Sequence, residues 1–439
     1  MHDSGFGGVR RSRWAAQPSA WLAVALAACC LLLADALHGQ TLPSPPAPGV
    51  TQSAFPNPQS APAISLLTIG PGEIYFERFG HNAIVVRDPL RDAAIAYNYG
   101  MFDFAEDDFL WNFARGRMRY RMAANPLAFD LAMYRAEGRS ITEQHLDLDP
   151  DQAAALAAFL EWNARPENAW YRYDYFDDNC STRVRDALDR VLGGRIKLQS
   201  EGRSRGYTYR LDALRLMVPE PALMLLIDLG LGPRSDQRID YWQESFVPMT
   251  LAQVVAETRR ADGRPLVAAT EVIARGEVAE PPLLPPDLRW PFLILGLALG
   301  TGLVWLGRRP ERVAQAAVAI FASVFVLACG LAGLALLFLW FGSAHQAAWG
   351  NENLALLNPL CLLLVPAWVG AWRRAWRPGK LSQGIAWLVV LIAGLALFSK
   401  ILPWFPQANA HWIFLLLPLH AALALDLRQR RMTPMPATR

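Results

Sequence analysis

Cysteine is scarce in this chain, and its placement limits what the chain can do. The 439 residues contain 5 cysteines. Two of them stand in the N-terminal apolar segment, Cys329 and Cys361 stand in later apolar segments, and Cys180 stands alone between these regions. A region with a single cysteine forms no internal disulfide, so Cys180 is either a core residue or a working thiol. A zinc site built on several thiolates is also excluded there.

Charged residues are also few. The chain is 18% charged and 53% hydrophobic, with a formal net charge of +3. It is too apolar for a simple soluble protein and has no broad basic stretch interleaved with aromatic residues, so nucleic acid is not an expected partner. His81 and His145 lack the spacing of metal ligands, and the glycines at 296, 300 and 302 lie in an apolar run rather than a phosphate-binding loop. We therefore expect no metal and no other cofactor.

The N-terminal residues predict export. Arg10, Arg11 and Arg13 precede an apolar run over residues 21–33, so residues 1–40 are typical of a signal peptide or an N-terminal membrane anchor. Residues 41–63 are rich in Pro, Ser and Ala, which predicts a tether. The region that follows is then expected outside the cytoplasm.

From residue 287 the chain predicts a membrane domain. Its apolar segments long enough to cross a bilayer cover about 290–306, 314–341, 353–371, 384–402 and 411–425. Basic clusters follow the first, third and fifth segments, whereas the connections after the second and fourth carry almost no positive charge. The positive-inside rule places a tail over 428–439 in the cytoplasm and residues 64–286 outside it, with transmembrane helices over 287–427.

Residues 64–286 mix strand and helix patterns, which predicts an α+β domain. Strands are expected over 64–69, 81–86, 93–99, 112–122 and 140–148, and helices over 150–164, 180–192 and 221–229. Asp88-Pro89-Leu90-Arg91 is a turn signal between two of the strands. A hairpin centred there pairs His81 with Asn98 and puts both side chains on one face of the sheet.

Cys180 stands at the expected start of a helix that Gly193-Gly194 closes. Asp178 or Asn179 caps this helix, which puts the thiol in its first turn. The positive end of the helix dipole lowers a thiol pKa there, although neighbouring carboxylates oppose this effect. The sulfur falls on the apolar stripe of the helix, where a structural core cysteine is the alternative.

A cysteine at a helix N-terminus, a histidine at a strand end and a polar residue on the next strand form a thiol–imidazole–orienter system. His81 directly follows Phe79-Gly80 at the start of a strand, whereas His145 stands in mid-strand and suits a structural role. We therefore expect His81 to be the base for Cys180.

These motifs resemble a known family. Phe79-Gly80-His81-Asn82-Ala83, followed downstream by Asn179-Cys180-Ser181-Thr182, is similar to the circularly permuted branch of the papain-like, NlpC-related superfamily. Over about 64–360 the chain resembles the Lnb-type family, bacterial membrane proteins that join an exported thiol domain to several C-terminal helices. The resemblance implies an α+β, circularly permuted papain-like (NlpC-related) domain over 64–286, followed by an all-α bundle of about five transmembrane helices. Other matching motifs are Asn98-Tyr99-Gly100-Met101-Phe102-Asp103-Phe104, Thr208-Tyr209-Arg210, Asn351-Glu352-Asn353 and Asn358-Pro359.

The resemblance implies lipoprotein N-acylation at the bacterial inner membrane, with the catalytic domain in the periplasm. Cys180 takes an acyl chain from a phospholipid as a thioester and passes it to the N-terminal amine of a diacylglyceryl-cysteine lipoprotein, and His81 carries the protons. Asn98 is the candidate orienter, with Tyr99 and Asp103 as competitors. The matching motifs also supply candidate substrate-binding residues, which are Asn179, Tyr99, Arg183, Tyr209, Arg210, Asn351 and Asn353.

Other functions stay open from the sequence. One is a cysteine amidase or endopeptidase acting on cell-wall peptide, against which the membrane spans weigh. Another is a non-catalytic membrane module, in which Cys180→Ala changes stability alone. The alternating arginines over 115–121 either contact lipid phosphates or are solvated. Polar residues of the outer loops either line the substrate's access route or cap helix ends; these are His345, Asn351, Asn353, Asn409 and His411.

Overall fold

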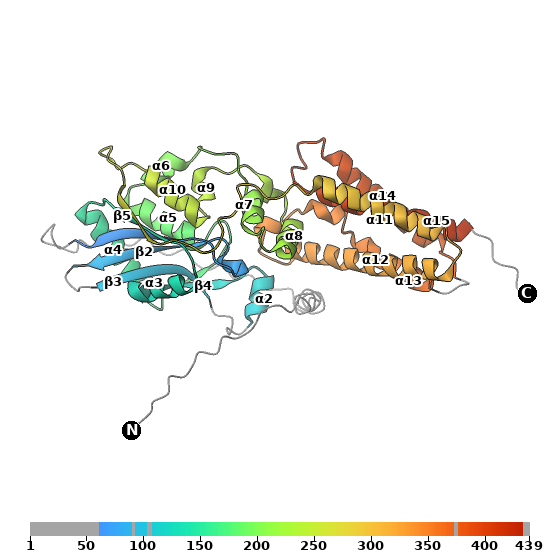
Figure 1. The fold of residues 1–439 in the computed structure, drawn as a ribbon, viewed down its shortest axis with the longest axis horizontal. Helices are drawn as coiled ribbons and strands as arrows, with labels where there is room; N and C mark the ends of the chain where they lie inside the picture. Colours follow the sequence, from blue (N-terminus) through green and yellow to red (C-terminus); the bar gives the residue numbers. More distant parts are fainter. Residues whose placement is uncertain (1–60, 90–92, 103–107, 373–375, 433–439) are drawn as a thin grey trace, which may run out of the picture. The chain divides into compact units, whose positions relative to one another are not determined.

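The computed structural model describes residues 61–89, 93–102, 108–372 and 376–432 (Figure 1). The expected signal peptide or anchor over 1–40 lies outside these residues, as do the tether up to residue 60 and the tail from residue 433. Arg91 of the expected turn and Asp103, a competitor for the orienter role, also lie outside them.

Among the described residues, the N-terminal domain is built on a seven-stranded sheet with the order β6-β4-β3-β2-β1-β5-β7. Every neighbouring pair of strands is antiparallel. The strands are β1 (Ala63–Ile69), β2 (His81–Asp88), β3 (Ala93–Met101), β4 (Arg119–Pro126), β5 (Ile141–Leu146), β6 (Trp170–Arg172) and β7 (Val267–Ala274). The α+β class is confirmed, and β1, β2, β3 and β5 confirm expected strands.

The stretch expected as a strand over 112–122 is only partly a strand. Residues 109–114 instead form helix α2 (Phe109–Ala114), so the expectation is wrong there. Apolar and polar residues do not alternate in this segment, as they would in a half-buried strand. Gly116, just after the end of the helix, takes the left-handed conformation with φ of 66°. In β4 the alternation holds, because exposed Arg119 and Arg121 alternate with buried side chains.

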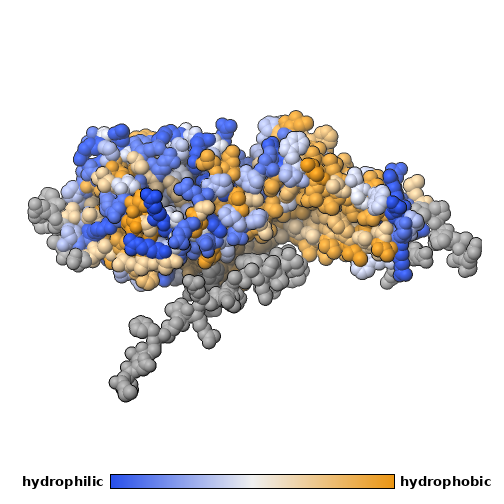
Figure 2. All heavy atoms as spheres, in the orientation of Figure 1, coloured by the Kyte–Doolittle hydropathy of each residue, from blue (hydrophilic) through white to orange (hydrophobic). Residues whose placement is uncertain are grey.

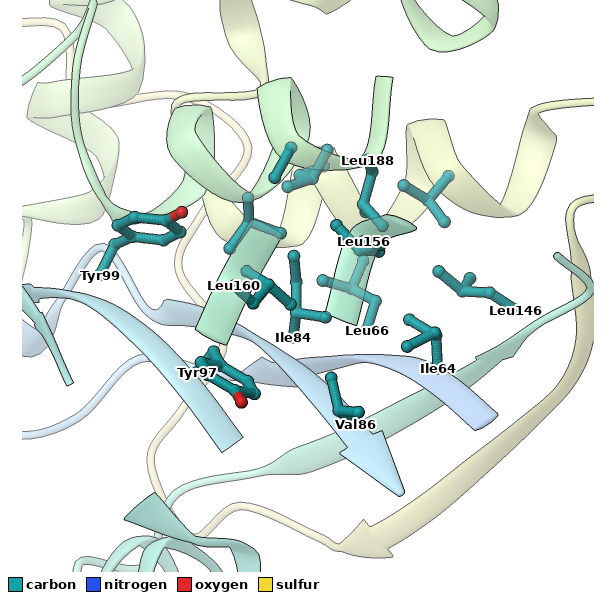
Figure 3. Close-up of a cluster of buried hydrophobic side chains, with 14 of the residues drawn as sticks. Ile64, Leu66, Ile84, Val86, Tyr97, Tyr99, Leu146, Leu156, Leu160 and Leu188 are labelled. Carbon is teal, nitrogen blue, oxygen red and sulfur yellow. The ribbon is translucent and has the colours of Figure 1, made fainter. Parts of the chain in front are cut away.

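Helices cover both faces of the sheet (Figure 1). One face packs against α4 (Pro150–Asn163), α5 (Cys180–Val191) and α10 (Pro248–Glu257). Figure 3 shows the apolar side chains of this interface, among them Leu66, Ile84 and Leu188, gathered between the strands and the helices. The opposite face, which includes Leu67 and Val85, packs against α3 (Leu127–Ala136).

Shorter helices lie between these elements, the first between β1 and β2 and the others between α5 and α10. They are η2 (Tyr75–Glu77), α6 (Arg195–Ser200), α7 (Tyr209–Leu216), α8 (Pro221–Gly230), η3 (Pro233–Asp236) and α9 (Tyr241–Glu244). The capping box at the start of α4 was expected from the sequence and is formed by Asp149 and Gln152.

Five segments of the C-terminal half are long and apolar enough to cross a membrane, which confirms the expected number for the described residues. Four are α11 (Arg289–Gly307), α12 (Arg312–Phe341), α14 (Lys380–Ser399) and α15 (Ala410–Met432). The third segment, Glu352–Gly370, is broken into η5 (Glu352–Ala355), η6 (Pro359–Leu364) and α13 (Val365–Gly370), because Pro359 cannot continue a regular helix. Figure 2 shows the apolar surface concentrated over this half of the molecule.

Candidate active site

Cys180 is the first residue of α5, and Asn179 caps that helix. The Asn179 side-chain oxygen accepts hydrogen bonds of 2.9 Å from the backbone N–H groups of Ser181 and Thr182. The Asn179 amide group donates to the backbone carbonyl of Phe246 at 2.9 Å, which ties the start of the helix to a distant loop. The sequence left Asp178 and Asn179 open as caps, and the structure selects Asn179. These contacts fix the position from which the thiol projects.

The Cys180 thiol lies in a tight, half-buried place. A Cβ added at Gly100 would stand 3.3 Å from the Cβ of Cys180, so β3 approaches the cysteine closely where its chain takes a φ of 92°. Burial raises the pKa of the thiol to about 11, while hydrogen bonds from the backbone of Asn82, Ser181 and Cys180 itself act in the opposite direction. The expected lowering of this pKa is therefore wrong, because desolvation outweighs the helix N-terminus.

His81 is the first residue of β2, and its side chain bonds to Asn98 of β3. His81 Nε2 lies 2.9 Å from Asn98 Oδ1. In the ladder, however, Asn98 faces Ala83, two residues away from the expected partner, because Asp88 pairs with Ala93. Residues two apart on a strand share a face. The register was therefore wrong by two residues, yet the predicted face was right.

Asp130 of α3 determines how the Asn98 amide is oriented. Asn98 Nδ2 donates to Asp130 Oδ2 at 2.7 Å and to the backbone carbonyl of Ala96 at 3.2 Å. Its Oδ1 therefore faces His81 as an acceptor, and His81 Nε2 must carry the proton that it donates. The other ring nitrogen, Nδ1, then has a free lone pair. This is the tautomer that a base for a thiol requires.

The imidazole is neutral at ordinary pH. Burial lowers the pKa of His81 to about 4, the hydrogen bond with Asn98 opposes this shift, and the charge of Arg139 adds to it. Both shifts favour the uncharged forms, a neutral imidazole and a neutral thiol, over a preformed thiolate–imidazolium ion pair. The thiol proton would be transferred during attack on a substrate, as with a hydroxyl nucleophile.

A direct contact joins the two chain segments that carry Cys180 and His81. Ser181 Oγ donates to Asn82 Oδ1 at 2.8 Å, and each of these residues directly follows one of the two candidate catalytic residues. The alternation of β2 turns Asn82 toward α5 and His81 toward Asn98. Both candidate residues lie near the end of the sheet where the pairing of β3 with β4 becomes irregular between Asn98 and Met101.

Tyr99 and Arg183, two expected substrate-binding residues, lie beside α5. Tyr99 is buried, and its hydroxyl donates to Asn163 Oδ1 at 2.7 Å. The Arg183 guanidinium stacks 3.7 Å from the ring centre of Tyr171 and pairs with Asp178 at 2.6 Å. Tyr99 and Arg183 line a cavity of about 340 Å³ whose lining does not include Cys180. Tyr99 was an alternative to Asn98 as the residue that orients His81. Its hydroxyl donates to Asn163, whereas the Asn98 side chain bonds to His81.

Arg210, Asn351 and Asn353 lie in a buried polar network that joins the sheet domain to the membrane segments. Arg210 pairs with Asp228 of α8 at 2.7 Å, and His411 Nε2 of α15 lies 2.5 Å from the same carboxylate. Asn351 and Asn353 each donate to the carbonyl of Leu229 near the end of α8, at 2.9 and 3.0 Å. These bonds satisfy carbonyls that the helix leaves free. Substrate binding by these residues stays a prediction.

Tyr209 and Asn179 are likewise occupied by internal contacts. The Tyr209 ring stacks 4.5 Å from that of Phe176, and its neighbour Phe246 lies 5.3 Å away. Both hydrogen-bonding groups of the Asn179 side chain serve the helix cap and its anchoring. A role for either residue in substrate binding also stays a prediction.

Among the described residues, one cluster of side chains has donor atoms close enough for a cation. Glu143, His145 and Glu271 bring one ligand atom each to within 4.8 Å of one another. Arg87 already holds the Glu143 carboxylate with two hydrogen bonds of 2.5 and 2.9 Å, and His145 Nδ1 lies 3.1 Å from Ser65 Oγ. Both oxygens of one candidate ligand are thus already bonded to an internal cation.

Asp130 is the residue that sequence reasoning missed. It is fully buried, and its second carboxylate oxygen accepts from Asn125 Nδ2 at 2.9 Å. An aspartate in an apolar segment, Leu127-Ala128-Phe129-Asp130-Leu131, is the only signal that the sequence offers. A buried carboxylate requires partners, which directs attention to the amides that surround it.

Comparison with family models gives two matches. Residues 57–219 match the model described as the Lnb N-terminal periplasmic domain. Residues 290–429 match the model described as the Lnb transmembrane domain. Comparison with curated proteins gives no match, and comparison with solved structures gives none. The two matches follow the chain in the order of its sheet domain and its apolar segments.

Proposed function

The chain belongs to the Lnb family, whose domains indicate a membrane enzyme that modifies lipoproteins, and from this premise we propose a lipoprotein N-acyltransferase. The donor is a phospholipid, and the acceptor is the N-terminal amine of a diacylglyceryl-cysteine lipoprotein. The enzyme is a multi-pass protein of the bacterial inner membrane, and residues 64–286 form a catalytic domain in the periplasm. Residues 287–427 form its transmembrane domain.

The observation that carries the proposal is the hydrogen bond between His81 and Asn98, on strands whose segments also approach the start of the helix of Cys180 through Asn82 and Gly100. It gives the imidazole the tautomer of a general base at the end of the sheet where the helix of Cys180 begins. A second observation supports a lipid substrate over cell-wall peptide. The sheet domain is hydrogen-bonded to the apolar segments through Asn351 and His411, which suits chemistry at the bilayer surface.

The first half-reaction forms the thioester. The sulfur of Cys180 attacks the ester carbonyl carbon of the phospholipid, while His81 Nδ1 accepts the thiol proton. The carbon–oxygen ester bond breaks, and His81 returns this proton to the leaving lysophospholipid oxygen. Asn98 holds the ring in place throughout, and Asp130 holds Asn98.

The second half-reaction releases the acyl chain from Cys180 and regenerates the thiol. The lipoprotein amine attacks the thioester carbonyl, a carbon–nitrogen bond forms and the carbon–sulfur bond breaks. His81 accepts a proton from the amine and returns it to the sulfur. The products are an amide on the lipoprotein and a regenerated thiol, so no further reactant is required.

Mass spectrometry of the whole protein incubated with phospholipid vesicles tests this proposal. Wild type should gain an acyl adduct on the Cys180 peptide that neutral hydroxylamine removes, and Cys180→Ala and His81→Ala should not. The matched control is His145→Ala, which should keep the adduct. No adduct on folded wild-type protein with any phospholipid would reject the acyltransferase. Cleavage of wall peptide would then identify the amidase, and no activity would leave the non-catalytic module.

A further inference from the structure

A continuous set of aromatic rings runs from α2 to the neighbourhood of Cys180. We call it the aromatic surface; its members are Phe76, Phe102, Phe109, Phe113, Tyr120, Tyr173 and Tyr175. Neighbouring rings lie 4.1 to 6.5 Å apart between their centres, the shortest step being that between Tyr120 and Tyr173. Rings at this spacing form one connected apolar face.

The inner end of the aromatic surface is Tyr173, in the same core region as the thiol. Tyr173 and Cys180 both pack against the same buried core cluster. Burial raises the pKa of Tyr173, and the charge that Cys180 would carry as a thiolate raises it further, because the two groups are close. An acyl group on the sulfur would therefore extend over aromatic side chains.

The outer end lies at the end of a membrane span. Trp111 of α2 stacks on Phe338 of α12, with ring centres 6.4 Å apart. Just beyond α12, the backbone N–H of Ala344 donates to the carbonyl of Arg115 at 2.9 Å. His345 stacks on Tyr175 with an angle of 16° between the rings. The aromatic surface thus borders His345, in the connection that follows α12, and the other side of α2 packs on the last turn of α12 through Trp111.

Part of the aromatic surface is open. Phe113 is 45% exposed, Phe76 is 43% exposed, and Leu110 on the same helix as Phe113 is 66% exposed. Exposed apolar side chains that adjoin one another mark binding surfaces for apolar ligands or partners. This exposed group stands between a membrane span and a nucleophile, and its rings carry no charge.

We propose that the aromatic surface binds the acyl chain of the phospholipid donor while its ester reaches Cys180. The inference rests on the proposed function and adds the acyl-binding site to it. An acyl chain that leaves the bilayer would otherwise expose its methylene groups to water, and the rings replace that water. The chain can then reach the thiol while its headgroup stays at the bilayer surface.

Substitutions at the open end separate chain binding from chemistry. Phe76→Ala and Phe113→Ala should lower formation of the Cys180 adduct from long-chain phospholipid vesicles by about tenfold or more, as loss of one good apolar contact does. Both should leave acylation by a water-soluble butyryl thioester within about twofold of wild type. The control Phe129→Ala, an aromatic residue of α3 that is 61% exposed, should change neither rate. Equal losses with both donors, or no loss with either, would overturn the inference.

Photo-cross-linking tests whether the aromatic surface binds the acyl chain, even if no acyl transfer occurs. Full-length Cys180→Ala protein is illuminated in vesicles of a phospholipid that carries a diazirine near the ester end of its acyl chain. Cross-links on peptides containing Phe109–Ala114 or Tyr173 and Tyr175 are expected. Cross-links confined to α11, α12, α14 and α15 would overturn the inference. Cross-links at the aromatic surface without any wild-type adduct would reject the acyltransferase but keep the acyl-binding site.

Discussion

Asn98 Nδ2 donates a 2.7 Å hydrogen bond to the fully buried carboxylate of Asp130. This bond decides which end of the Asn98 side chain faces His81, and so decides which nitrogen of the imidazole holds its proton. A residue from α3, on one face of the sheet, is thus linked through Asn98 to His81, while the helix of Cys180 packs on the other face. Under the proposed function Asp130 is a positioning residue, because it would reach the reacting atoms only through Asn98.

Replacing the Asp130 carboxylate by an amide should impair acylation. In Asp130→Asn the Asn98 amide loses its fixed acceptor and can rotate to present its NH₂ group to His81. The imidazole then keeps the wrong tautomer, and the rate of Cys180 adduct formation should fall by about 10² to 10⁴, the usual contribution of a general base. The measurement is the rate of adduct formation from phospholipid vesicles across pH.

A purely structural role for Asp130 would give a different result. It would lower the amount of folded protein without changing the rate per folded molecule or its pH profile. Asp151→Asn, at an exposed position in the first turn of α4, is the matched control and should behave as wild type. A wild-type rate of adduct formation in folded Asp130→Asn protein would show that Asp130 does not position Asn98 for catalysis.

The neutral thiol–imidazole pair predicts a distinctive pH dependence. Because the pKa of Cys180 is raised to about 11, its alkylation by iodoacetamide should keep rising with pH until about 11. Because the pKa of His81 is lowered to about 4, formation of the Cys180 thioester from phospholipid should persist in mildly acidic buffer and fall only as His81 gains a proton near pH 4. Peptide mass spectrometry gives the alkylation rate of Cys180. A rate already constant between about pH 5 and 8 would instead indicate a thiolate–imidazolium pair.

The polar network at α8 should contribute strongly to stability. Arg210 is buried between Asp228 and Asp236, at 2.7 and 2.8 Å. Arg210→Met leaves two buried carboxylates without their shared cation, and should lower the free energy of unfolding by about 3 to 5 kcal/mol. Chemical denaturation in detergent micelles measures the change. Arg289→Met, at an exposed ion pair with Asp287, is the control and should change little. Equal changes in the free energy of unfolding for the two substitutions would contradict a strong stabilising role of the network.

The sequence predicted the elements that carry the site better than their register. β2 and β3 follow from short apolar runs on either side of a turn signal, and α5 follows from its cap and its closing glycines. The loop between Asp88 and Ala93 is longer than the expected turn, and nothing in Pro89-Leu90-Arg91 distinguishes the two lengths. The contact between His81 and Asn98 is present despite this error, because a shift of two residues preserves the face of a strand, whereas the role of Cys180 beside them stays a prediction.

The rest of the site depends on tertiary contacts. Asp130 stands in α3 with no partner near it in sequence other than Asn125, so only folding reveals its bond to Asn98. The pKa of Cys180 was predicted in the wrong direction because a helix N-terminus can be recognised in a sequence, whereas desolvation depends on what covers the thiol. Arg210 and Asn351 illustrate the same limit, since their partners lie in α8 and at its C-terminal end.

The amides that hold α8 also bear on how substrates would be met. Asn351 and Asn353, both bonded to Leu229, attach the sheet domain to the apolar segments by more than the connecting chain. Under the proposed function, both lipid substrates then arrive by lateral diffusion within one leaflet. Encounter becomes two-dimensional. Turnover follows the mole fraction of donor and acceptor in that membrane, and diluting the vesicles in buffer leaves it unchanged.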